Sequence, residues 1–513
     1  MAYAKALASA ASRNPAAKAL VSAGRALTWG EVAERASRAA AGLGSLGLRP
    51  GDRVAILAAL TEEQAILQCA ASWAGLVVAP MNTRLSPDEQ REICKDADVA
   101  AIAFDSAFEG RAQAIAQALG VRHRIYLGGG GAGTVSSLAL LQPEPAAPVE
   151  WPDLALAALI YTGGSTGRPK GVMLPHKAMA VEGQAMADSL GYDDATVYLH
   201  GLTMFHVAGM AQFLGVTQSG GAHVFPTAAG PAATFEAIRH LGVNHLCGAP
   251  TSMALLLDAP SDDLTLLRKI RAFGYGAASI SEALLRRALS AMPNTRFVQF
   301  FGQTETCGSV SVLPADRHVL DGPKSGRLGT VGRAHSHYEI RIADAEGNLL
   351  RDGETGEIVV RGEAVSLGYW RQGELTAQLF RDGWVHTGDV GRLDEDGFLT
   401  VVDRLKDMIV SGGENVYTSE VENVLCAHPA VDSCAVIGVP HPLWGEAVHA
   451  IVRLKKDQIA SQEDLLDHCR RYIGGYKCPK SISFRTAPLP LSGIGKVMKH
   501  ELRKEYGASI QAE

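Results

Sequence analysis

Residues 161–171 read YTGGSTGRPKG and carry the clearest chemical pattern of the chain. The apolar stretch 154–161 predicts a buried strand that leads into them. A strand that ends in a loop of glycines and hydroxyl residues presents backbone N–H and O–H donors to an anion, and a nearby lysine adds positive charge. The pattern therefore predicts a polyphosphate-binding loop with contacts from Thr162, Gly163, Gly164, Ser165, Thr166, Gly167 and Lys170.

This loop is not a Walker A motif, because that motif needs Gly-Lys followed directly by Ser or Thr. Here Arg168 and Pro169 separate Gly167 from Lys170. A flexible surface loop is the alternative interpretation of a glycine- and serine-rich run taken alone. The strand in front and the RPKG sequence behind favour phosphate binding.

The sequence YTGGSTGRPKG resembles the phosphate-loop signature of the adenylate-forming enzymes, which include acyl-CoA synthetases, peptide-synthetase adenylation domains and beetle luciferases. The resemblance extends over nearly the whole chain, because further family motifs follow in the family's order. They are FGQTE (301–305), GEIVVRG (356–362), WVHTGDVG (384–391), DRLKDMIVSGGENVY (403–417) and GIGKVMKHELR (493–503). The resemblance implies an enzyme that activates a carboxylic acid with ATP and Mg²⁺ and transfers the acyl group to coenzyme A.

Composition sets the broad limits. A chain of 513 residues predicts two or more domains. A net charge of −6 and a pI near 6.3 give no basic footprint for nucleic acid, so no nucleic-acid partner is expected. No apolar run approaches the roughly 20 residues of a membrane span. The eight scattered cysteines are typical of buried thiols in a reducing compartment.

The first 30 residues contain basic and no acidic side chains, which raises the question of a removable leader. The stretch 14–36 already resembles the family's first folded segment, which leaves no room for a leader. We therefore expect a cytoplasmic enzyme. Whether it forms a homodimer is left open.

Strand-like and helix-like stretches alternate along the first four hundred residues. Residues 52–60 predict a strand, 62–75 a helix and 76–82 the next strand. This alternation indicates an α/β fold with largely parallel sheets covered by helices. Short strands and turns dominate near 340–405.

The resemblance refines this plan. It implies a large N-terminal, AMP-binding domain over 1–403, with two stacked, mainly parallel αβα sheets and a small antiparallel β-barrel. A hinge over 404–406 would pivot at Lys406. A small, mobile α+β domain over 407–513 would carry the catalytic lysine and part of the CoA site, and would rotate between the two half-reactions.

Joining a carboxylate to ATP requires that negative charge be neutralised. Glu305 is expected to bind Mg²⁺, a hard cation that prefers carboxylate and phosphate oxygens. The hydroxyl of Thr304 would donate to the α-phosphate. An exposed cap or turn is the alternative for a Thr-Glu pair, and the strand-like stretch 295–300 before it favours a site.

The nucleoside would be held by separate segments. Asp389 in HTGDVG is expected to accept from the ribose hydroxyls, although Asp after Gly is also a common turn cap. Arg404 would be a second ribose or phosphate contact, with a surface linker arginine as the alternative. The resemblance assigns the adenine side to Gly276, Ala277, Ala278, Phe301 and Gly302.

Lys496 is the candidate catalytic lysine. It would contact the substrate carboxylate and the α-phosphate, where charge grows in the transition state. The family usually has Thr-Gly-Lys here and this chain has Ile-Gly-Lys, so the glycine and lysine are retained. Lys499 and Lys504 are interpreted as solvated helix charges.

The second step needs a thiol. Gly412 and Gly413 would let the pantetheine arm pass close to the backbone. Positions that hold the CoA nucleotide in related ligases are matched by Trp444, Tyr476, Lys477 and Lys480. The two lysines could meet a 3′-phosphate, and an ordinary basic surface turn is the alternative for the KCPK sequence.

His206 is expected to gate the acyl pocket and to sit near the carboxylate, with a core histidine as the alternative. The remaining predicted lining is small and apolar: Val207, Ala208, Gly209, Cys247, Gly248, Gly276, Gly302, Gly308 and Ser309. Such a pocket suits an aromatic, hydroxycinnamic or medium-to-long acyl tail. No Asp precedes His206 to hold an α-amine, and no Arg is placed to pair a second carboxylate.

Three other functions compete with a carboxylic acid–CoA ligase. Adenylation for a carrier protein is disfavoured because no carrier or condensation domain is attached. A luciferase-like oxygenase shares the fold, and fold alone does not define function. A non-catalytic nucleotide-binding scaffold is disfavoured because Glu305, Asp389 and Lys496 are all retained.

Overall fold

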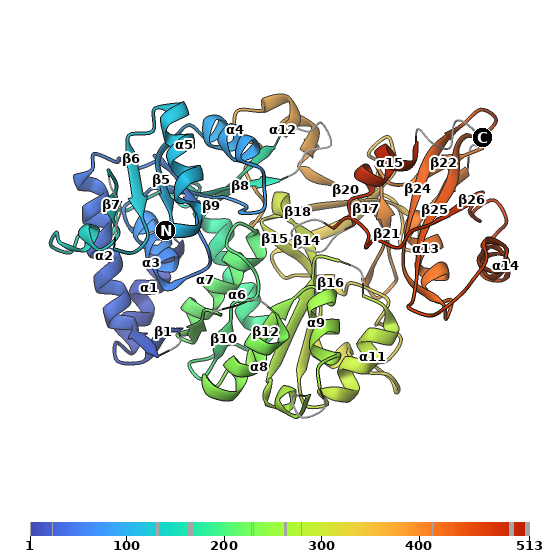
Figure 1. Cartoon of the computed structure of the whole chain (residues 1–513), viewed down its shortest axis with the longest axis horizontal. Helices are drawn as coiled ribbons and strands as arrows, with labels where there is room; N and C mark the ends of the chain where they lie inside the picture. The colour runs from blue at the N-terminus through green and yellow to red at the C-terminus, as the bar shows by residue number, and fades with distance from the viewer. Residues whose placement is uncertain are drawn as a thin grey trace.

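The computed structural model describes residues 2–22, 24–129, 133–162, 169–226, 228, 230–260, 264–278, 280–412, 414–491 and 497–507. Two large sheets and one smaller sheet form the body of the molecule, and a fourth sheet forms a block at its C-terminal end (Figure 1). The prediction of an α/β fold with a small second domain is confirmed.

The larger sheet of the body has nine strands among the described residues, and most neighbouring pairs are parallel. In spatial order they are β16 (Arg333–Ala334), β15 (Gly308–Leu313), β14 (Arg296–Gln303), β13 (Ala272–Gly276), β12 (His245–Gly248), β10 (Val197–Leu199), β11 (Ala222–Val224), β1 (Lys18–Ser22) and β2 (Arg25–Thr28).

The second large sheet has seven described strands and is parallel except for the hairpin at one edge. Its order is β7 (Val135–Ser136), β6 (His123–Tyr126), β5 (Val99–Phe104), β3 (Arg53–Leu57), β4 (Val77–Pro80), β8 (Leu156–Thr162) and β9 (Lys170–Pro175). The predicted strands over 52–60, 76–82 and 154–161 correspond to β3, β4 and β8. Strands β3 and β4 are apolar along almost their whole length because helices cover both faces of a parallel sheet.

Helices fill the space between and around the two sheets (Figure 1). Helix α6 contacts β8 and β9 of one sheet and β13, β14 and β15 of the other, so it lies between them. It packs on α7 and α1. The helices of the body are α1 (Ala2–Arg13), α2 (Trp29–Ser45), α3 (Glu62–Trp73), α4 (Pro87–Ala97), α5 (Glu109–Leu119), α6 (His176–Leu190), α7 (Val207–Ser219), α8 (Pro231–His240), α9 (Pro250–Leu257), α11 (Glu282–Ala291) and α12 (Gly373–Leu379).

The small antiparallel barrel expected near 340–405 corresponds to a five-stranded antiparallel sheet in the described chain. Its strands are β17 (Tyr338–Ala343), β18 (Gly356–Gly362), β20 (Trp384–Leu393), β19 (Phe380–Arg381) and β21 (Leu399–Arg404). The N–H of Leu405 still donates to the carbonyl of Gly388 at 2.9 Å, so the body holds the chain one residue past the end of β21.

The C-terminal block begins at β22 and has its own core. Its strands are β23 (Glu414–Val416), β22 (Ile409–Ser411), β25 (Gly445–Leu454), β24 (Val431–His441) and β26 (Ser481–Phe484), and its helices are α13 (Thr418–Cys426), α14 (Gln462–Tyr472) and α15 (Lys499–Gly507). Helix α14 lies at the end of the molecule farthest from the body (Figure 1). The hinge over 404–406 and the division at 403 stay predictions.

A buried carboxyl group joins α6 to the start of β15. The N–H of Ser309 donates to Oε1 of Glu182 at 2.8 Å, and a Cβ on Gly308 would lie 2.4 Å from the same oxygen. Burial raises the pKa of Glu182 to about 8, so this side chain is protonated at neutral pH. Glycine at 308, at a positive φ, is therefore what lets the strand approach the helix.

The substitution Glu182→Gln tests this protonation. Below the ordinary carboxyl pKa of 4.5 the folded and unfolded chains both hold the proton, and between 4.5 and about 8 only the folded chain does. The free energy of unfolding of the parent therefore falls as pH rises through this window. That of the glutamine variant does not, because it has no carboxyl group at this position. Its stability relative to the parent should rise by on the order of 3 kcal/mol from pH 4.5 to 8.

Chemical denaturation at pH 4.5, 6 and 8 measures this difference. Glu34→Gln, on an exposed part of α2, is the matched control and should show no such trend. A constant difference between Glu182→Gln and the parent across these pH values contradicts a protonated Glu182.

Candidate functional site

Three sheets contribute loops to one region of the body. The end of β14 runs into a short 3₁₀ turn, η4 (Thr304–Thr306), which contacts β20 of the antiparallel sheet. The side-chain amide of Gln303 donates to the carbonyl of Thr387 at 3.0 Å and fastens β14 to β20. The segment 366–370 then joins η4 to β9: the N–H of Ser366 donates to the carbonyl of Glu305 at 3.1 Å, and the N–H of Trp370 to that of Gly171 at 2.7 Å.

Tyr369 connects two of the predicted ligand contacts. Its hydroxyl donates to Oε1 of Glu305 at 3.0 Å, and Nζ of Lys170 lies 5.1 Å from the centre of its ring. Burial and the neighbouring carboxylate raise the pKa of Tyr369, so it stays a hydrogen-bond donor. The proposed magnesium ligand and the proposed phosphate lysine therefore both lie next to Tyr369. Tyr369 was missed in the sequence because nothing in its spacing marks it.

Lys170 lies at the base of the β8–β9 hairpin, directly opposite Thr162 in the strand register. The two residues flank the predicted phosphate loop. The loop residues Gly163, Gly164, Ser165, Thr166 and Gly167 lie outside the described part of the chain.

Glu305 is the predicted metal ligand. No group of three or more His, Cys, Asp and Glu side chains that could hold a metal occurs among the described residues. One half-buried carboxylate in the same region as the predicted phosphate lysine fits Mg²⁺, which commonly takes one or two protein carboxylates and completes its shell with phosphate oxygens and water. Thr304, its neighbour in η4, is half-buried.

Asp389 and Arg404 face each other across β20 and β21. They are paired in the strand register, and Nε of Arg404 lies 3.2 Å from Oδ1 of Asp389. Asp389 is buried, and Arg404 is half-buried. The pair holds the carboxylate on β20 against the end of β21, the last strand before the C-terminal block, as the predicted role of ribose acceptor would require.

The adenine-side residues lie at the ends of neighbouring strands. Gly276 is the last residue of β13 and is opposite Phe300 on β14, one residue before Phe301. Ala277 has φ of 65°, an uncommon conformation for a residue with a Cβ. A Cβ on Gly302 would lie 1.8 Å from the carbonyl oxygen of Gly308, so only glycine allows β14 and β15 to approach here. Ala278 continues the same turn.

The predicted acyl-pocket residues occupy four adjacent strands and the start of α7. Gly248, Gly276 and Gly302 lie at or near the ends of β12, β13 and β14, and Gly308 and Ser309 begin β15. Half-buried His206 is the N-cap of α7 and its backbone carbonyl accepts the N–H of Gly209. Within the first turn of α7, Val207 and Gly209 are buried and Ala208 is exposed.

A polar group beside this lining was missed in the sequence. Gln212 on α7 is 1% exposed; its Nε2 lies 3.4 Å from the sulfur of Cys247, and its Oε1 accepts the hydroxyl of Tyr192. Its position on a helix among apolar neighbours is typical of a core residue. Only the folded structure therefore shows that its side-chain amide lies beside the predicted acyl-pocket lining.

The predicted CoA residues of the C-terminal block fall into two groups. The N–H of Gly412 donates to the carbonyl of Trp444 at 2.9 Å, and Nζ of exposed Lys480 lies 5.1 Å from the Trp444 ring. Lys477 instead donates to both carboxylate oxygens of Glu420 at 2.8 Å. Tyr476 is exposed, with Nζ of Lys477 5.7 Å from its ring.

Gly413 and the candidate catalytic Lys496 lie outside the described residues. Lys406, the predicted pivot, is exposed between β21 and β22. The roles given to all of these side chains stay predictions.

Comparison with known proteins settles the family. The model of the AMP-binding enzymes matches residues 7–370, and that of the AMP-binding enzyme C-terminal domain matches 420–496. The chain belongs to the AMP-binding enzymes. The resemblance to adenylate-forming enzymes is thereby confirmed.

Named relatives cover almost the whole chain. A feruloyl-CoA synthase from Amycolatopsis sp is 37% identical over 503 residues, which are 96% of this chain and 97% of the relative. The fatty acid–[acyl-carrier-protein] ligase ScoC of Streptomyces coeruleorubidus is 33% identical over 97% of this chain and 95% of its own.

One solved relative is available in two states. ATP-bound MatB from Rhodopseudomonas palustris superposes with a TM-score of 0.88 at 29% identity, and apo MatB with 0.80 at 30%, each over 99% of both chains. The arrangement of this AMP-binding enzyme is therefore closer to the ATP-bound state of MatB. None of its described helices has the length and apolar character needed to cross a bilayer.

The substitution Tyr369→Phe tests the connection between Lys170 and Glu305. The ring beneath the lysine is kept and only the hydrogen bond to Glu305 is lost. Because a hydrogen bond to a charged group is removed, we expect the KM for magnesium ATP to rise about fivefold to tenfold. Initial rates at varied magnesium ATP measure this, with Tyr275→Phe, whose hydroxyl is 2.9 Å from His318, as the control. An unchanged KM separates Tyr369 from the metal site.

Proposed function

We propose that the chain is an AMP-forming carboxylic acid–CoA ligase. The observation that supports this is that the start of β9, the end of β14 and strand β20 meet in one region: Lys170 and Glu305 both contact Tyr369, and Gln303 is bonded to Thr387, two residues before Asp389. Lys170, Glu305 and Asp389 would serve phosphate, metal and ribose. The names of its relatives support the same class. The reaction converts acid, ATP and CoA into acyl-CoA, AMP and pyrophosphate.

In the first half-reaction the carboxylate oxygen of the acid attacks the α-phosphorus, and pyrophosphate leaves to give the acyl-adenylate. Magnesium, when bound at Glu305, neutralises charge on the phosphates. Thr304 would donate to the α-phosphate, and Asp389 would orient the ribose. Lys496 would stabilise the charge that develops between carboxylate and α-phosphate. Most of the rate gain would come from positioning for in-line attack.

In the second half-reaction the thiol of CoA attacks the acyl carbon and displaces AMP. Gly412 and Trp444 lie together, which gives the pantetheine arm a backbone edge beside an aromatic face. Lys480 stands next to them, exposed, and is the better candidate for the 3′-phosphate. Lys477 already has Glu420 as its partner, so it would have to exchange that carboxylate for a phosphate.

An aromatic or hydroxycinnamic acid is the substrate that the pocket favours over a medium-to-long fatty acid. Most of the predicted lining residues are glycines or other small residues, which would suit a flat ring, with His206 at the entrance. Gln212 and Tyr192 add a buried polar pair beside Cys247, and a buried polar pair is better used by a ring hydroxyl than by a hydrocarbon tail. We also place the enzyme in the cytoplasm, where its eight free thiols would stay reduced.

Transfer to a carrier protein is the second candidate, because one relative is a fatty acid–carrier ligase. A panel of carboxylic acids, assayed for pyrophosphate release with and without CoA, separates the candidates. A CoA ligase turns over with hydroxycinnamic acids only when CoA is present. Turnover that depends on a phosphopantetheinylated carrier, and not on CoA, would reject the CoA ligase.

The substitution Lys496→Ala tests the first half-reaction. Loss of the amine removes the charge that meets both reacting anions, so acid-dependent exchange of pyrophosphate into ATP should fall by about 100-fold or more. The matched control is Lys504→Ala, whose side chain is 74% exposed. Equal exchange in the Lys496 variant and the parent, with both folded by circular dichroism, refutes the assignment.

The substitution Lys480→Ala tests CoA binding in the second half-reaction. A lysine on the 3′-phosphate should give the parent a KM for CoA about tenfold below that for dephospho-CoA. The variant should lose this preference and keep its rate of adenylate formation. Lys455→Ala, elsewhere in the same block, serves as control. A preference that survives in Lys480→Ala assigns the 3′-phosphate to another residue.

A further inference from the structure

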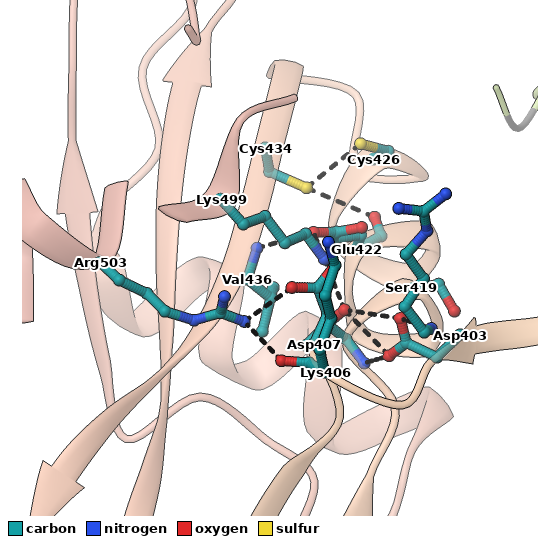
Figure 2. A network of polar contacts seen from close by, with 12 residues as sticks. Asp403, Lys406, Asp407, Ser419, Glu422, Cys426, Cys434, Val436, Lys499 and Arg503 are labelled. Carbon is teal, nitrogen blue, oxygen red and sulfur yellow. Dashed lines mark hydrogen bonds and ion pairs between the residues drawn. The ribbon is translucent and has the colours of Figure 1, made fainter. Parts of the chain in front are cut away.

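A chain of polar contacts crosses the junction between the body and the C-terminal block (Figure 2). Asp403 belongs to the body, because it pairs with Val390 in the antiparallel sheet. Its carboxylate accepts both the N–H of Thr418 and the hydroxyl of Thr418, the latter at 2.9 Å. The hydroxyl of Ser419 donates to the carbonyl of Val402. The first two residues of α13 are thus bound by β21.

These contacts replace a cap that α13 lacks. The residue at its N-cap, Tyr417, makes no side-chain capping hydrogen bond. The start of a helix carries unsatisfied N–H groups and a partial positive charge, which a carboxylate satisfies. Asp403 supplies this carboxylate from the other side of the predicted hinge. It is 8% exposed and Thr418 is fully buried.

Lys499 extends the network to α15. Its ammonium donates to the hydroxyl of Thr418 and lies 2.8 Å from Oε1 of Glu422, which also accepts the N–H of Val436 at 2.8 Å. The Lys499 side chain is 13% exposed. The prediction of a solvated helix charge was therefore wrong for Lys499, and it is confirmed for Lys504, which is 74% exposed.

The same helix holds the junction at a second point. Arg503, one turn after Lys499, donates to Oδ1 of Asp407 at 2.9 Å and reaches the carbonyl of Lys406 at 3.5 Å. Helix α15 starts three residues after Lys496. The position of the candidate catalytic segment therefore depends on where these contacts hold α15.

The charges are divided between the two units in a way that lets the contact open. Lys499 and Glu422 both belong to the C-terminal block and neutralise one another without help from the body. Burial raises the pKa of Glu422, and Lys499 opposes that shift. Withdrawal of Asp403 therefore leaves no unpaired buried charge in the block, which would otherwise be costly. Only the cap of α13 is lost.

We propose that Asp403, Thr418 and Lys499 form a latch that holds the C-terminal block in the arrangement used for adenylate formation. The latch rests on the proposed function and on a pivot at Lys406, which lies between Asp403 and Thr418 in the chain. A rotation about that pivot that moves α13 away from β21 separates the two. The arrangement that carries the latch here is the one closer to ATP-bound MatB. The three are positioning residues that act through the segment of Lys496.

Two variants break the latch in different ways. Asp403→Ala removes the acceptor from the body, and Thr418→Val removes the hydroxyl that joins Asp403 to Lys499 and keeps the N–H. Asp432→Asn, which disrupts a partly exposed pair with Arg453 in the same block, is the matched control. Single-turnover assays follow acyl-adenylate formation from acid and ATP, and separately thioester formation from preformed acyl-adenylate and CoA.

Adenylate formation should slow about tenfold in both latch variants, as expected for loss of a helix cap and its linked lysine. Thioester formation should be unchanged or faster, because the block is released from the first arrangement. Equal losses in both half-reactions together with a lower Tm indicate a merely structural role and overturn the latch. Unchanged rates in both also overturn it.

Cleavage by trypsin tests the latch without an assay of catalysis, so it separates the latch from the proposed function. Arg404 and Lys406 are trypsin sites in the junction, and an open latch frees the backbone around them from the hydrogen bonds that now hold it to Gly388 and Arg503. Cleavage between 404 and 407, identified by mass, should be about fivefold faster in Asp403→Ala than in the parent or Asp432→Asn. If the parent activates no acid, the proposed function fails while this cleavage difference still supports the latch. Identical cleavage in all three overturns it.

Discussion

Repulsion between two anions is the constraint on which this site depends. A carboxylate must approach the α-phosphate of a nucleotide that carries several negative charges, and at 4 Å two unit charges repel by about 4 kcal/mol even at an effective dielectric constant near 20. No single element of the fold supplies enough positive charge or enough donors to offset this. The structure gathers candidate groups from three sheets: Lys170 comes from the β8–β9 hairpin, Glu305, the predicted metal ligand, from the turn after β14, and Asp389 from β20.

Tyr369 shows how such a gathering is stabilised before any ligand arrives. A lysine and a metal-binding carboxylate placed side by side would form a salt bridge and occupy each other. Here the ring of Tyr369 lies beside the ammonium and its hydroxyl binds the carboxylate, so each charge has a partner that is not the other charge. Both partners are neutral. A phosphate can therefore bind the lysine, and Mg²⁺ the second oxygen of Glu305 while Tyr369 keeps the first oriented, without an ion pair having to be broken first.

The fold and the order of the motifs could be predicted from the sequence because they depend on local patterns. Apolar runs predict β3, β4 and β8, and motif residues such as Asp389 lie in strands whose register then fixes their partners. The residues that were missed depend on contacts between distant segments. Gln212 has the helical spacing of a core residue, and Glu182 resembles any charged helix residue until β15 is packed against it.

Lys499 is the clearest case of a local pattern that fails. The sequence of α15 is strongly polar, which is typical of a helix surrounded by solvent, and Lys504 fits that pattern. Lys499 differs because its surroundings are built from Asp403, Thr418 and Glu422, which lie 77 or more positions earlier in the chain. Its direct partners, Thr418 and Glu422, are brought to it by the folding of the C-terminal block, and Asp403 is added by the docking of the body on that block. A single sequence does not record that geometry.

A catalytic group carried on a mobile block has to satisfy two opposing demands. It must be held to a fraction of an ångström during adenylate formation, since small misplacements cost large factors in rate. It must also leave when the thiol arrives. The proposed latch meets both demands. Asp403 caps α13 in one arrangement, and Lys499 is balanced by Glu422, a carboxylate of its own block. In the proposed latch these contacts would hold the block during the first step and leave no stranded charge when it turns.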